Sequence, residues 1–364
     1  MSKFKITCVA PSYNHEKFVG FFIESVLNQT EQNFELIIVD DGSQDKNVDA
    51  ILKFKDKRIK LIRHEYNKGI GQALNTAFKF ARGKYIVFAG TDDIFESVHF
   101  ETVSRYLDTN PNVGAYYCSC SLIDNKNNKI EDPNNMYVRK DINRFDILNT
   151  IFFLGNNLLD PGKAIRYKIV KKQIPFSASL LSLSDVQSHV KVALNSDIYT
   201  SDQRLVKYRL SGVSNTNTYF FKREQLEIDL LMNSFLQIKN VQLLEKIFEP
   251  EIKQSGLIPF KDTIPYFLGR MALLSVNNAR KEWGYRTILN FLNNEKNSLI
   301  VYKKYNQSYK DIHNLIELLY YIKNEILPWY SLKRMLNFVF VKEKTGKLRK
   351  IKVFGHAMFT YRKK

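Results

Sequence analysis

Two pairs of adjacent aspartates, Asp40-Asp41 and Asp92-Asp93, are the residues of this sequence best suited to do chemistry. Each pair follows a short apolar run rich in β-branched and aromatic residues, which is the pattern of a buried strand. In an open α/β sheet, ligands bind just beyond the carboxyl ends of the strands. Four carboxylates at that edge predict a site for a hard cation, Mg²⁺ or Mn²⁺, and for the phosphates that it neutralises.

The elements that must position these pairs alternate along the first 120 residues. Strands alternating with single helices indicate βαβ units, and therefore an α/β fold with a mostly parallel central sheet flanked by helices. Right-handed crossovers place all the strand-to-helix loops on one edge of such a sheet. The expected strands cover 6–10, 59–63, 113–120 and two runs that end at Asp40 and Ala89, and the expected helices cover 17–28, 48–54, 71–81 and 97–109.

The pattern changes after Tyr219, where apolar residues such as Leu226 and Leu230 recur at helical spacing. We therefore expect an α-helical C-terminal region after the sheet. A polar stretch at 124–132 is expected to be a surface loop. The predicted divisions are a sheet domain at 1–216, a helical appendage at 217–327 and a basic C-terminal tail at 328–364.

Positive charge is concentrated at the end of the chain. The net charge is +18, and residues 331–364 hold eleven Lys and Arg against one acidic residue, Glu343. Such a segment predicts an anionic partner. Docking on an anionic membrane surface is our hypothesis, because each basic residue near an anionic leaflet contributes about 1 kcal/mol. A solvated tail, or a strand pair that closes the helical region, explains the same residues equally well.

The remaining composition limits the class of protein. A hydrophobic content of 44% and an aromatic content of 13% exclude wholesale disorder. Cys8, Cys118 and Cys120 cannot all pair within one molecule, and buried reduced thiols explain them better than a metal or redox site. The first residues lack the apolar stretch of a signal peptide, and no run approaches the ~20 apolar residues of a spanning helix. We expect a cytoplasmic protein, peripheral at the inner face of the cell membrane.

Six short motifs occur in a fixed order along the first hundred residues. They are VAPSYN at 9–14, SVLNQT at 25–30, VDDGS at 39–43, NKG through ALN at 67–75, ARGKYI at 81–86 and TDD at 91–93. In this order the chain resembles the family 2 glycosyltransferases, densely over 5–107 and more loosely to about residue 215. The resemblance implies a GT-A fold, a nucleotide-sugar donor whose base is usually uracil, a divalent metal, and inversion at the anomeric carbon.

The resemblance also implies roles around the nucleotide. The Tyr13 ring would stack on the base, and Asp41 would accept a hydrogen bond from a base N–H. Asp40 is expected to brace the loop, because Asp-Gly-Ser is also a common turn sequence. An ordinary turn residue explains Asn67 almost as well as a position near the base. The implied nucleotide-binding residues are Pro11, Tyr13, Asp41, Asn67, Gly71 and Thr91.

For the metal, the resemblance implies that Asp92 is the ligand and that Asp93 orients the acceptor or a metal-bound water. Gly90 stands where the fuller family motif has a further aspartate, and Ser211 stands where many relatives carry a histidine. With two side chains of the family pattern missing, we expect a sparse metal shell.

For the general base of the transfer, residues 183–190 resemble the family segment that removes the proton of the acceptor hydroxyl. The resemblance implies that Asp185 is this general base. The match is partial, because Ser184 and Gln187 stand where acids are frequent. A capping aspartate at a helix start is the alternative for Asp185. His189, four residues on, either steers Asp185 or packs in the core.

The leading prediction is an inverting glycosyltransferase that moves a hexosyl or N-acetylhexosaminyl group from a nucleotide sugar to a growing surface glycan or a lipid-linked glycan. A nucleotidyl transferase usually shows a glycine-rich phosphate loop after the first strand, where this chain has residues 11–14. A basic nucleic-acid-binding or membrane-binding non-enzyme fits the pI of about 9.5. It leaves the four carboxylates unexplained, so we expect no nucleic-acid partner.

Overall fold

A nine-stranded sheet is the centre of the molecule. The computed structural model describes residues 3–132, 140–156, 158–180, 182–210 and 220–314, and the backbone of 340–345, 348–353 and 356–362. The strand order is β3-β2-β1-β4-β8-β6-β9-β5, and β7 pairs with β6. Six strands run in one direction, whereas β5, β7 and β8 run against them, so the mostly parallel sheet predicted from the sequence is confirmed. The strand bounds are β1 Phe4–Ser12, β2 Phe34–Asp40, β3 Ile59–Arg63, β4 Gly83–Phe88, β5 Ile94–Phe95, β6 Val113–Ile123, β7 Lys129–Ile130, β8 Ala164–Arg166 and β9 Asp197–Arg209.

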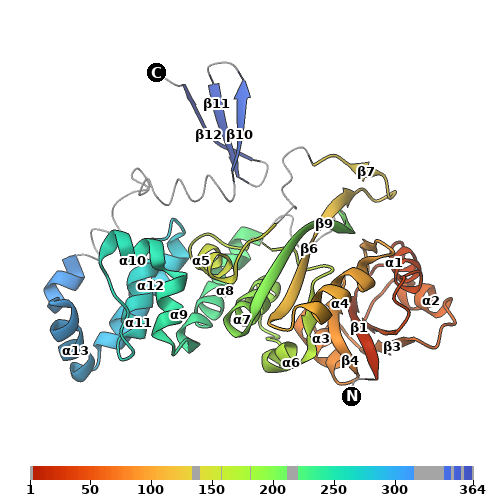
Figure 1. The fold of residues 1–364 in the computed structure, drawn as a ribbon, viewed down its shortest axis with the longest axis horizontal. Helices are drawn as coiled ribbons and strands as arrows, with labels where there is room; N and C mark the ends of the chain where they lie inside the picture. The colour runs from red at the N-terminus through yellow and green to blue at the C-terminus, as the bar shows by residue number, and fades with distance from the viewer. Residues whose placement is uncertain are drawn as a thin grey trace.

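Helices cover both faces of this sheet (Figure 1). Along β1, Cys8 and Ala10 pack with α1 and α4, whereas Val9 packs on the opposite face with α3. This alternation follows from the period of two residues along a strand. The four helices predicted by residue range lie within three residues of those ranges: α1 Val19–Leu27, α2 Asn47–Leu52, α3 Ile70–Phe78 and α4 His99–Thr109.

The stretch 124–132 is more ordered than the expected surface loop. The Asp124 carboxylate accepts hydrogen bonds from the backbone N–H groups of Lys126 and Asn128, both at 2.8 Å, and so closes a tight turn. The turn returns the chain to pair with β6 as β7. The expectation of a loop was therefore wrong for Lys129–Ile130, because side-chain hydrogen bonding in the turn favours a short hairpin.

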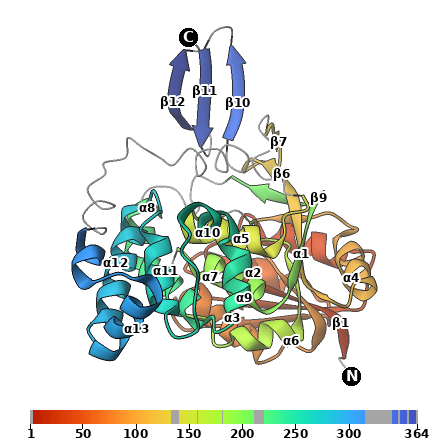
Figure 2. The ribbon, with the colours of Figure 1, turned by 60° about the vertical axis from the view of Figure 1, so that its left-hand side comes forward.

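The region from residue 220 to residue 305 is helical, as predicted. Helices α8 to α13 lie at one side of the molecule, beside α5 and α7 (Figures 1 and 2). The predicted boundary at residue 216 lies outside the described residues, as do 315–339, so the division into domains stays a prediction. The helix bounds are α5 Arg144–Phe153, α6 Tyr167–Val170, α7 Ser184–Asn195, α8 Phe220–Met232, α9 Val241–Ile247, α10 Glu249–Ser255, α11 Ile264–Ala272, α12 Asn278–Leu292 and α13 Glu295–Tyr305.

The described part of the basic tail forms a three-stranded antiparallel sheet of β10 (Phe340–Thr345), β11 (Leu348–Val353) and β12 (His356–Arg362). One alternative to membrane docking was a strand pair that closes the helical region, whereas these three strands form a sheet of their own. Closure of the helical region stays a prediction. Among the described residues, no helix is long and apolar enough to cross a membrane. The docking hypothesis stays a prediction.

One hydrophobic core connects the sheet with the helical region. Phe152, on α5, is fully buried, and its ring centroid lies 5.0 Å from Phe235, 4.8 Å from Phe248 and 6.4 Å from Trp283. The same core continues through α3 and α7 to one face of the sheet. The helices after residue 220 therefore bury the side of the sheet domain that carries α5 and α7.

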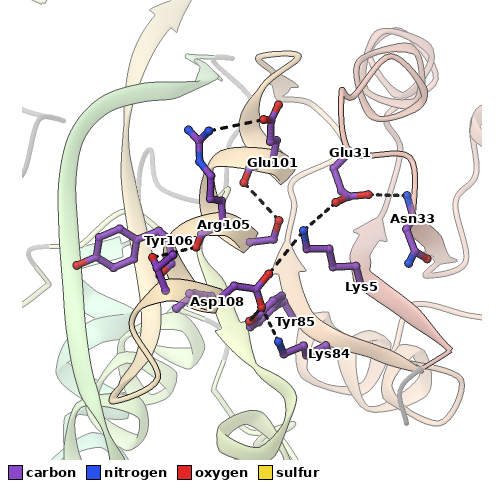
Figure 3. A network of polar contacts seen from close by, with 12 residues as sticks. Lys5, Glu31, Asn33, Lys84, Tyr85, Glu101, Arg105, Tyr106 and Asp108 are labelled. Carbon is purple, nitrogen blue, oxygen red and sulfur yellow. Dashed lines mark hydrogen bonds and ion pairs between the residues drawn. The ribbon is translucent and has the colours of Figure 1, made fainter.

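A charged network lies at the edge of the sheet where β1 and β4 begin, opposite the edge formed by their carboxyl ends (Figure 3). Asp108, at the end of α4, lies 3.6 Å from Lys5 Nζ and 2.5 Å from both Lys84 Nζ and the Tyr85 hydroxyl. Lys5, Lys84 and Asp108 are partly exposed, so each of the two ion pairs stabilises the fold by less than about 1 kcal/mol. The network fixes α4 against the amino ends of the strands and leaves the carboxyl ends free for loops.

Replacing Phe152 by Ala should lower the free energy of unfolding by about 3–5 kcal/mol, the usual cost of truncating a buried phenylalanine. Chemical denaturation monitored by circular dichroism measures the change. The control is Phe21→Ala on α1, because Phe21 is 46% exposed. A loss no larger than that of the control would contradict a core shared by the sheet and the helices.

Candidate active site

The carboxyl ends of β1, β2 and β4 meet at one edge of the sheet, and Thr91 joins two of their loops. The Thr91 hydroxyl is buried and lies 2.7 Å from His15 Nδ1 and 2.9 Å from Ser12 Oγ. It also lies 3.5 Å from the Pro11 carbonyl oxygen. The acidic loop 91–93 is therefore fixed against the loop after β1, and two of the predicted site residues, Pro11 and Thr91, come together here.

Asp40 is a structural brace, as expected. It is fully buried, and its carboxylate accepts hydrogen bonds from Asn47 Nδ2 at 2.7 Å and from Ser43 N at 3.2 Å. Arg63 lies 3.7 Å away. These contacts close the turn that follows β2 and aim the next residue, Asp41, towards the 66–69 loop.

Asp41 holds the 66–69 loop, which is the second loop at this edge. Its carboxylate accepts hydrogen bonds from Lys68 N at 2.9 Å and Gly69 N at 2.8 Å, and His64 Nδ1 lies 2.6 Å from it. The other nitrogen of His64 lies 2.9 Å from Thr76 Oγ1 on α3. Each carboxylate oxygen has two lone pairs, so Asp41 keeps capacity for a further donor. Its predicted contact with a base stays a prediction.

The other predicted nucleotide-binding residues differ in their exposure. Tyr13 is 39% exposed, and Asn67 lies on the surface of its loop. Gly69 has a φ of +84°, and a Cβ there would meet nothing within 4 Å, so open space lies beside it. At Gly71 a Cβ would lie 2.4 Å from the Ser177 carbonyl oxygen. Packing against the chain itself therefore explains Gly71 as well as an approach to the donor would.

The second aspartate pair is crowded. A Cβ at Gly90 would lie 2.8 Å from Asp92 Oδ1 and 2.8 Å from Asp93 Oδ2, so one oxygen of each carboxylate converges over this glycine. Asp93 is 1% exposed, and its Oδ1 accepts a hydrogen bond from Arg209 N at 2.9 Å. Burial and the neighbouring charge of Asp92 raise the pKa of Asp93 well above its usual range. A side chain at position 90 would displace at least one of the two carboxylates.

Arg209, at the end of β9, fixes the position of Asp92 and Asp93. Its Nε donates to the Asp92 carbonyl oxygen at 2.7 Å, and its other guanidinium nitrogens donate to the Asp124 carbonyl oxygen at 2.5 Å and to Asn127 Oδ1 at 2.6 Å. The guanidinium also lies 4.5 Å from the centroid of the Phe18 ring. Arg209 thus connects the acidic loop, the turn before β7 and the loop after β1.

A cation at this edge would be held by few side chains. Among the described residues, no group of three or more His, Cys, Asp or Glu converges in the way a metal site of side chains alone requires. The two oxygens over Gly90 nevertheless suit a hard cation, which prefers oxygen ligands. A cation there would also relieve the repulsion that raises the pKa of Asp93. Asp92 and Asp93 therefore fit a metal whose remaining ligands come from substrate or water.

Asp185 lies in the first turn of α7, where a general base or a capping residue was predicted. It is half-buried, and its Oδ1 accepts a hydrogen bond from Val186 N at 2.8 Å. Burial and the charge of Asp160 raise the pKa of Asp185 to about 7, although Lys163 acts in the opposite direction. A carboxylate that titrates near neutral pH has the proton affinity that a general base needs. Capping would by itself lower this pKa.

His189 is fully buried one turn further along α7. Its Nδ1 lies 3.2 Å from Asn156 Oδ1, and its Nε2 lies 3.2 Å from Asp160 Oδ1. Burial and the charge of Lys163 lower the pKa of His189 to about 4, so the ring is neutral at pH 7. His189 therefore adds no charge beside Asp185 at neutral pH, and its Nε2 contacts Asp160.

Several residues of this edge were not assigned by the sequence. His15 and His64 are isolated histidines in loops, and nothing in their local pattern indicates a partner. Arg209 lies in a segment that the resemblance includes, but its role depends on contacts with residues more than 80 positions away. Asp160 and Lys163 flank a Pro-Gly pair, which indicates only a turn.

Comparison with known proteins gives the family. The protein-family model described as glycosyl transferase family 2 matches residues 7–173 of this chain. The glucosyltransferase WfgD of Escherichia coli is named as a UDP-Glc:α-D-GlcNAc-diphosphoundecaprenol β-1,3-glucosyltransferase. It is 32% identical to this chain over 233 residues, which are 64% of this chain and 87% of WfgD. The chain belongs to glycosyl transferase family 2. It is a glycosyltransferase, so the nucleotidyl-transfer and non-enzyme alternatives are not favoured.

Other relatives of this glycosyltransferase agree. An uncharacterised glycosyltransferase of Methanocaldococcus jannaschii is 30% identical over 222 residues, 59% of this chain and 74% of that protein. Among solved structures, TarS 1-349 of S. aureus in complex with UDP covers 97% of this chain and 98% of its own, with 19% identity and a TM-score of 0.54. At this identity the likeness shows the fold alone. The predicted GT-A fold is confirmed.

The Asp185→Asn variant should be more thermostable than the wild type, by an amount that depends on pH. In unfolded chains the pKa of an aspartate is about 3.9, whereas in the folded glycosyltransferase it is raised to about 7. Between these values folding must bind a proton, so the destabilisation by Asp185 grows as the pH rises through this range and is constant above it. Asparagine cannot ionise and is free of this cost.

Differential scanning fluorimetry across the range from about pH 4 to about pH 8 measures the effect. The melting temperature gained by Asp185→Asn should be small at the acidic end and largest at the neutral end. Asp49→Asn, at an exposed aspartate of α2, is the matched control and should give a flat difference. A gain that does not vary with pH would contradict a raised pKa at Asp185.

Proposed function

We propose that this glycosyltransferase transfers a sugar, with inversion, from a UDP-sugar to a hydroxyl of a lipid-linked glycan or a growing surface glycan. One relative and one structural neighbour support the class of substrate. WfgD is named for UDP-Glc and a diphosphoundecaprenol-linked sugar, and TarS of S. aureus has been crystallised with UDP. A nucleotide bound at the edge of β1 and β2 would lie beside Tyr13, which is exposed, and beside the open space at Gly69.

The observation that carries this proposal is the environment of Asp185. In an inverting transfer the acceptor oxygen attacks the anomeric carbon while the bond from that carbon to the diphosphate oxygen breaks. The nucleoside diphosphate leaves with the electron pair of that bond, and the acceptor hydroxyl loses its proton. Asp185 takes this proton, since its pKa near 7 makes it ionised in part before the reaction and able to hold a proton afterwards.

Asp92 is proposed to hold a divalent metal, Mn²⁺ or Mg²⁺, together with the phosphates of the donor. Such a cation neutralises charge that builds on the leaving diphosphate. Asp93 is buried, and the backbone N–H of Arg209 fixes its carboxylate. Asp93 therefore holds Asp92 in position relative to the reacting groups. Thr91 fixes the whole loop against the loop after β1 through Ser12 and His15.

Asp185→Asn should reduce the transfer rate by about 10²–10⁴-fold, the usual contribution of a positioned general base. Donor binding should stay close to wild type, because the asparagine keeps the shape of the side chain and the base acts on the acceptor. The rate is measured as UDP release from UDP-glucose in the presence of a synthetic GlcNAc-diphospholipid. Donor binding is measured as the thermal shift that UDP-glucose produces. Loss of donor binding together with activity would assign Asp185 to the donor site instead.

Asp92→Ala should remove the part of donor binding that depends on metal. In the wild type, Mn²⁺ should increase the thermal shift produced by UDP-glucose, since a metal that joins protein and phosphates binds only the folded state. In Asp92→Ala the shift with Mn²⁺ should equal the shift with EDTA. Asp108→Asn, at the other edge of the sheet, is the control and should keep the metal response (Figure 3). A metal response that survives in Asp92→Ala would show that the metal is held elsewhere.

A further inference from the structure

A buried charged cluster lies beside Asp185 and has no part in the transfer described so far. Lys163 is 1% exposed and forms an ion pair with Asp160. Its Nζ also lies 3.3 Å from Ser188 Oγ on α7 and 4.4 Å from the centroid of the Phe88 ring. An ammonium group is costly to bury unless an acid compensates it, and Asp160 is that acid.

The turn that carries this pair is fixed against the end of β4. Gly162 N donates to the Phe88 carbonyl oxygen at 2.8 Å, and Phe88 N donates to the Lys163 carbonyl oxygen at 3.1 Å. Gly162 has a φ of +81°, and a Cβ there would lie 2.4 Å from Val206 Cγ2, so the turn requires glycine. Strand β4 leads directly into Gly90 and the acidic loop. The pair thus contacts both the strand that delivers this loop and the helix that delivers Asp185.

A purely structural ion pair would explain these contacts, because Asp160 also contacts His189 on α7. Tyr117 points to more than that. This residue of β6 is 1% exposed, its hydroxyl has no hydrogen-bond partner within the described part of the chain, and its ring packs edge-on against His189 at 5.3 Å between centroids. Burial and the charges of Asp160 and Asp185 raise the pKa of Tyr117 well above its usual range. Ser188 and His189, which the pair contacts, follow Asp185 by three and four residues and so share its face of α7, which places the pair beside Asp185.

The two members of the pair act on Asp185 with opposite signs. The charge of Asp160 disfavours ionisation of Asp185, whereas the charge of Lys163 favours it. Against burial, Lys163 and His189 hold the pKa of Asp160 below its usual range, so Asp160 stays negative at neutral pH. His189 is neutral there and adds no charge. From α8, Glu227 accepts hydrogen bonds from two backbone N–H groups just before α7, at 2.9 Å each, and is the further acid that faces this helix start.

We propose that Asp160 and Lys163 are positioning residues that determine when Asp185 accepts the proton of the acceptor hydroxyl. This inference rests on the proposed role of Asp185 as the base. Asp160 makes a second negative charge unfavourable, so Asp185 retains the proton that it has taken. Lys163 limits that effect, so Asp185 is still ionised often enough at neutral pH to start the reaction. Neutralising either member removes this balance, and the two changes act in opposite directions.

The test is the pH dependence of kcat/KM, measured as UDP release from UDP-glucose with the GlcNAc-diphospholipid acceptor. In the wild type, the rate should fall on the acid side with a midpoint near pH 7, where Asp185 becomes protonated. In Asp160→Asn the midpoint should move to lower pH by about one unit or more, since an adjacent charge shifts a pKa by ~1–3 units. In Lys163→Met it should move to higher pH. Loss of packing alone would lower the rate without moving the midpoint.

Matched variants separate charge from structure. Asp160→Glu and Lys163→Arg keep the charges and should return the midpoint towards that of the wild type. Asp49→Asn removes an exposed charge far from α7 and should leave the profile unchanged. Melting temperatures identify any variant that fails to fold, and Asp160→Ser is the second neutral replacement for that case. Midpoints that do not move, or that move in the same direction in Asp160→Asn and Lys163→Met, would overturn the inference.

The outcome for Asp185→Asn distinguishes this inference from the proposed function. If Asp185→Asn keeps the transfer rate, the base is misassigned and the proposed function fails, whatever the other variants show. If Asp185→Asn loses transfer while Asp160→Asn and Lys163→Met keep the wild-type midpoint, the base stands and only the positioning pair is wrong.

Discussion

Negative charge at the end of buried strands has to be matched by hydrogen-bond donors, and the loops of this glycosyltransferase are arranged around that requirement. Buried carboxylates without donors are strongly unfavourable. Asp41 therefore takes the N–H groups of Lys68 and Gly69, and Asp93 takes the N–H of Arg209. Since the 66–69 loop supplies the donors of Asp41 and the end of β9 supplies the donor of Asp93, satisfying the charges also fixes where these segments lie. The hydrogen bonds that stabilise the buried carboxylates therefore also position the site.

The helical region takes part in this arrangement through the start of α7. Glu227, on α8, is buried and accepts hydrogen bonds from the backbone N–H groups of Ser182 and Leu183, at 2.9 Å each. These two residues lead directly into the turn that carries Asp185. The core around Phe152 holds α5 and the later helices together. A region that the family motifs do not reach therefore determines where the proposed base lies.

The sequence predicted those parts of the fold that depend on local pattern. The strand at 59–63 was predicted with its observed bounds, because a short apolar run ends at polar residues on both sides. Strands such as β5 and β8 were missed, since two or three residues are too few to show a period. Within the site, the positions of the acidic loops followed from the strands, whereas the partners of Asp185 did not. Asp160 lies 25 residues before it, and only the folded chain shows that the two charges interact.

Gly90 illustrates how a residue can be identified correctly and explained incompletely by sequence. Against the family pattern it is a missing acid, which predicts a sparse metal shell. In the folded chain the space above Gly90 holds one oxygen each of Asp92 and Asp93, and Asp93 is already forced towards its neutral form. A third carboxylate at this position would add repulsion where two charges already oppose each other. Arg209 donates to Asp93 Oδ1 and to the Asp92 carbonyl oxygen, and not to Asp92 Oδ1 and Asp93 Oδ2, which are the oxygens over Gly90. It therefore does not offset that repulsion fully. The glycine thus allows two converging acids to share a place that has no room for three.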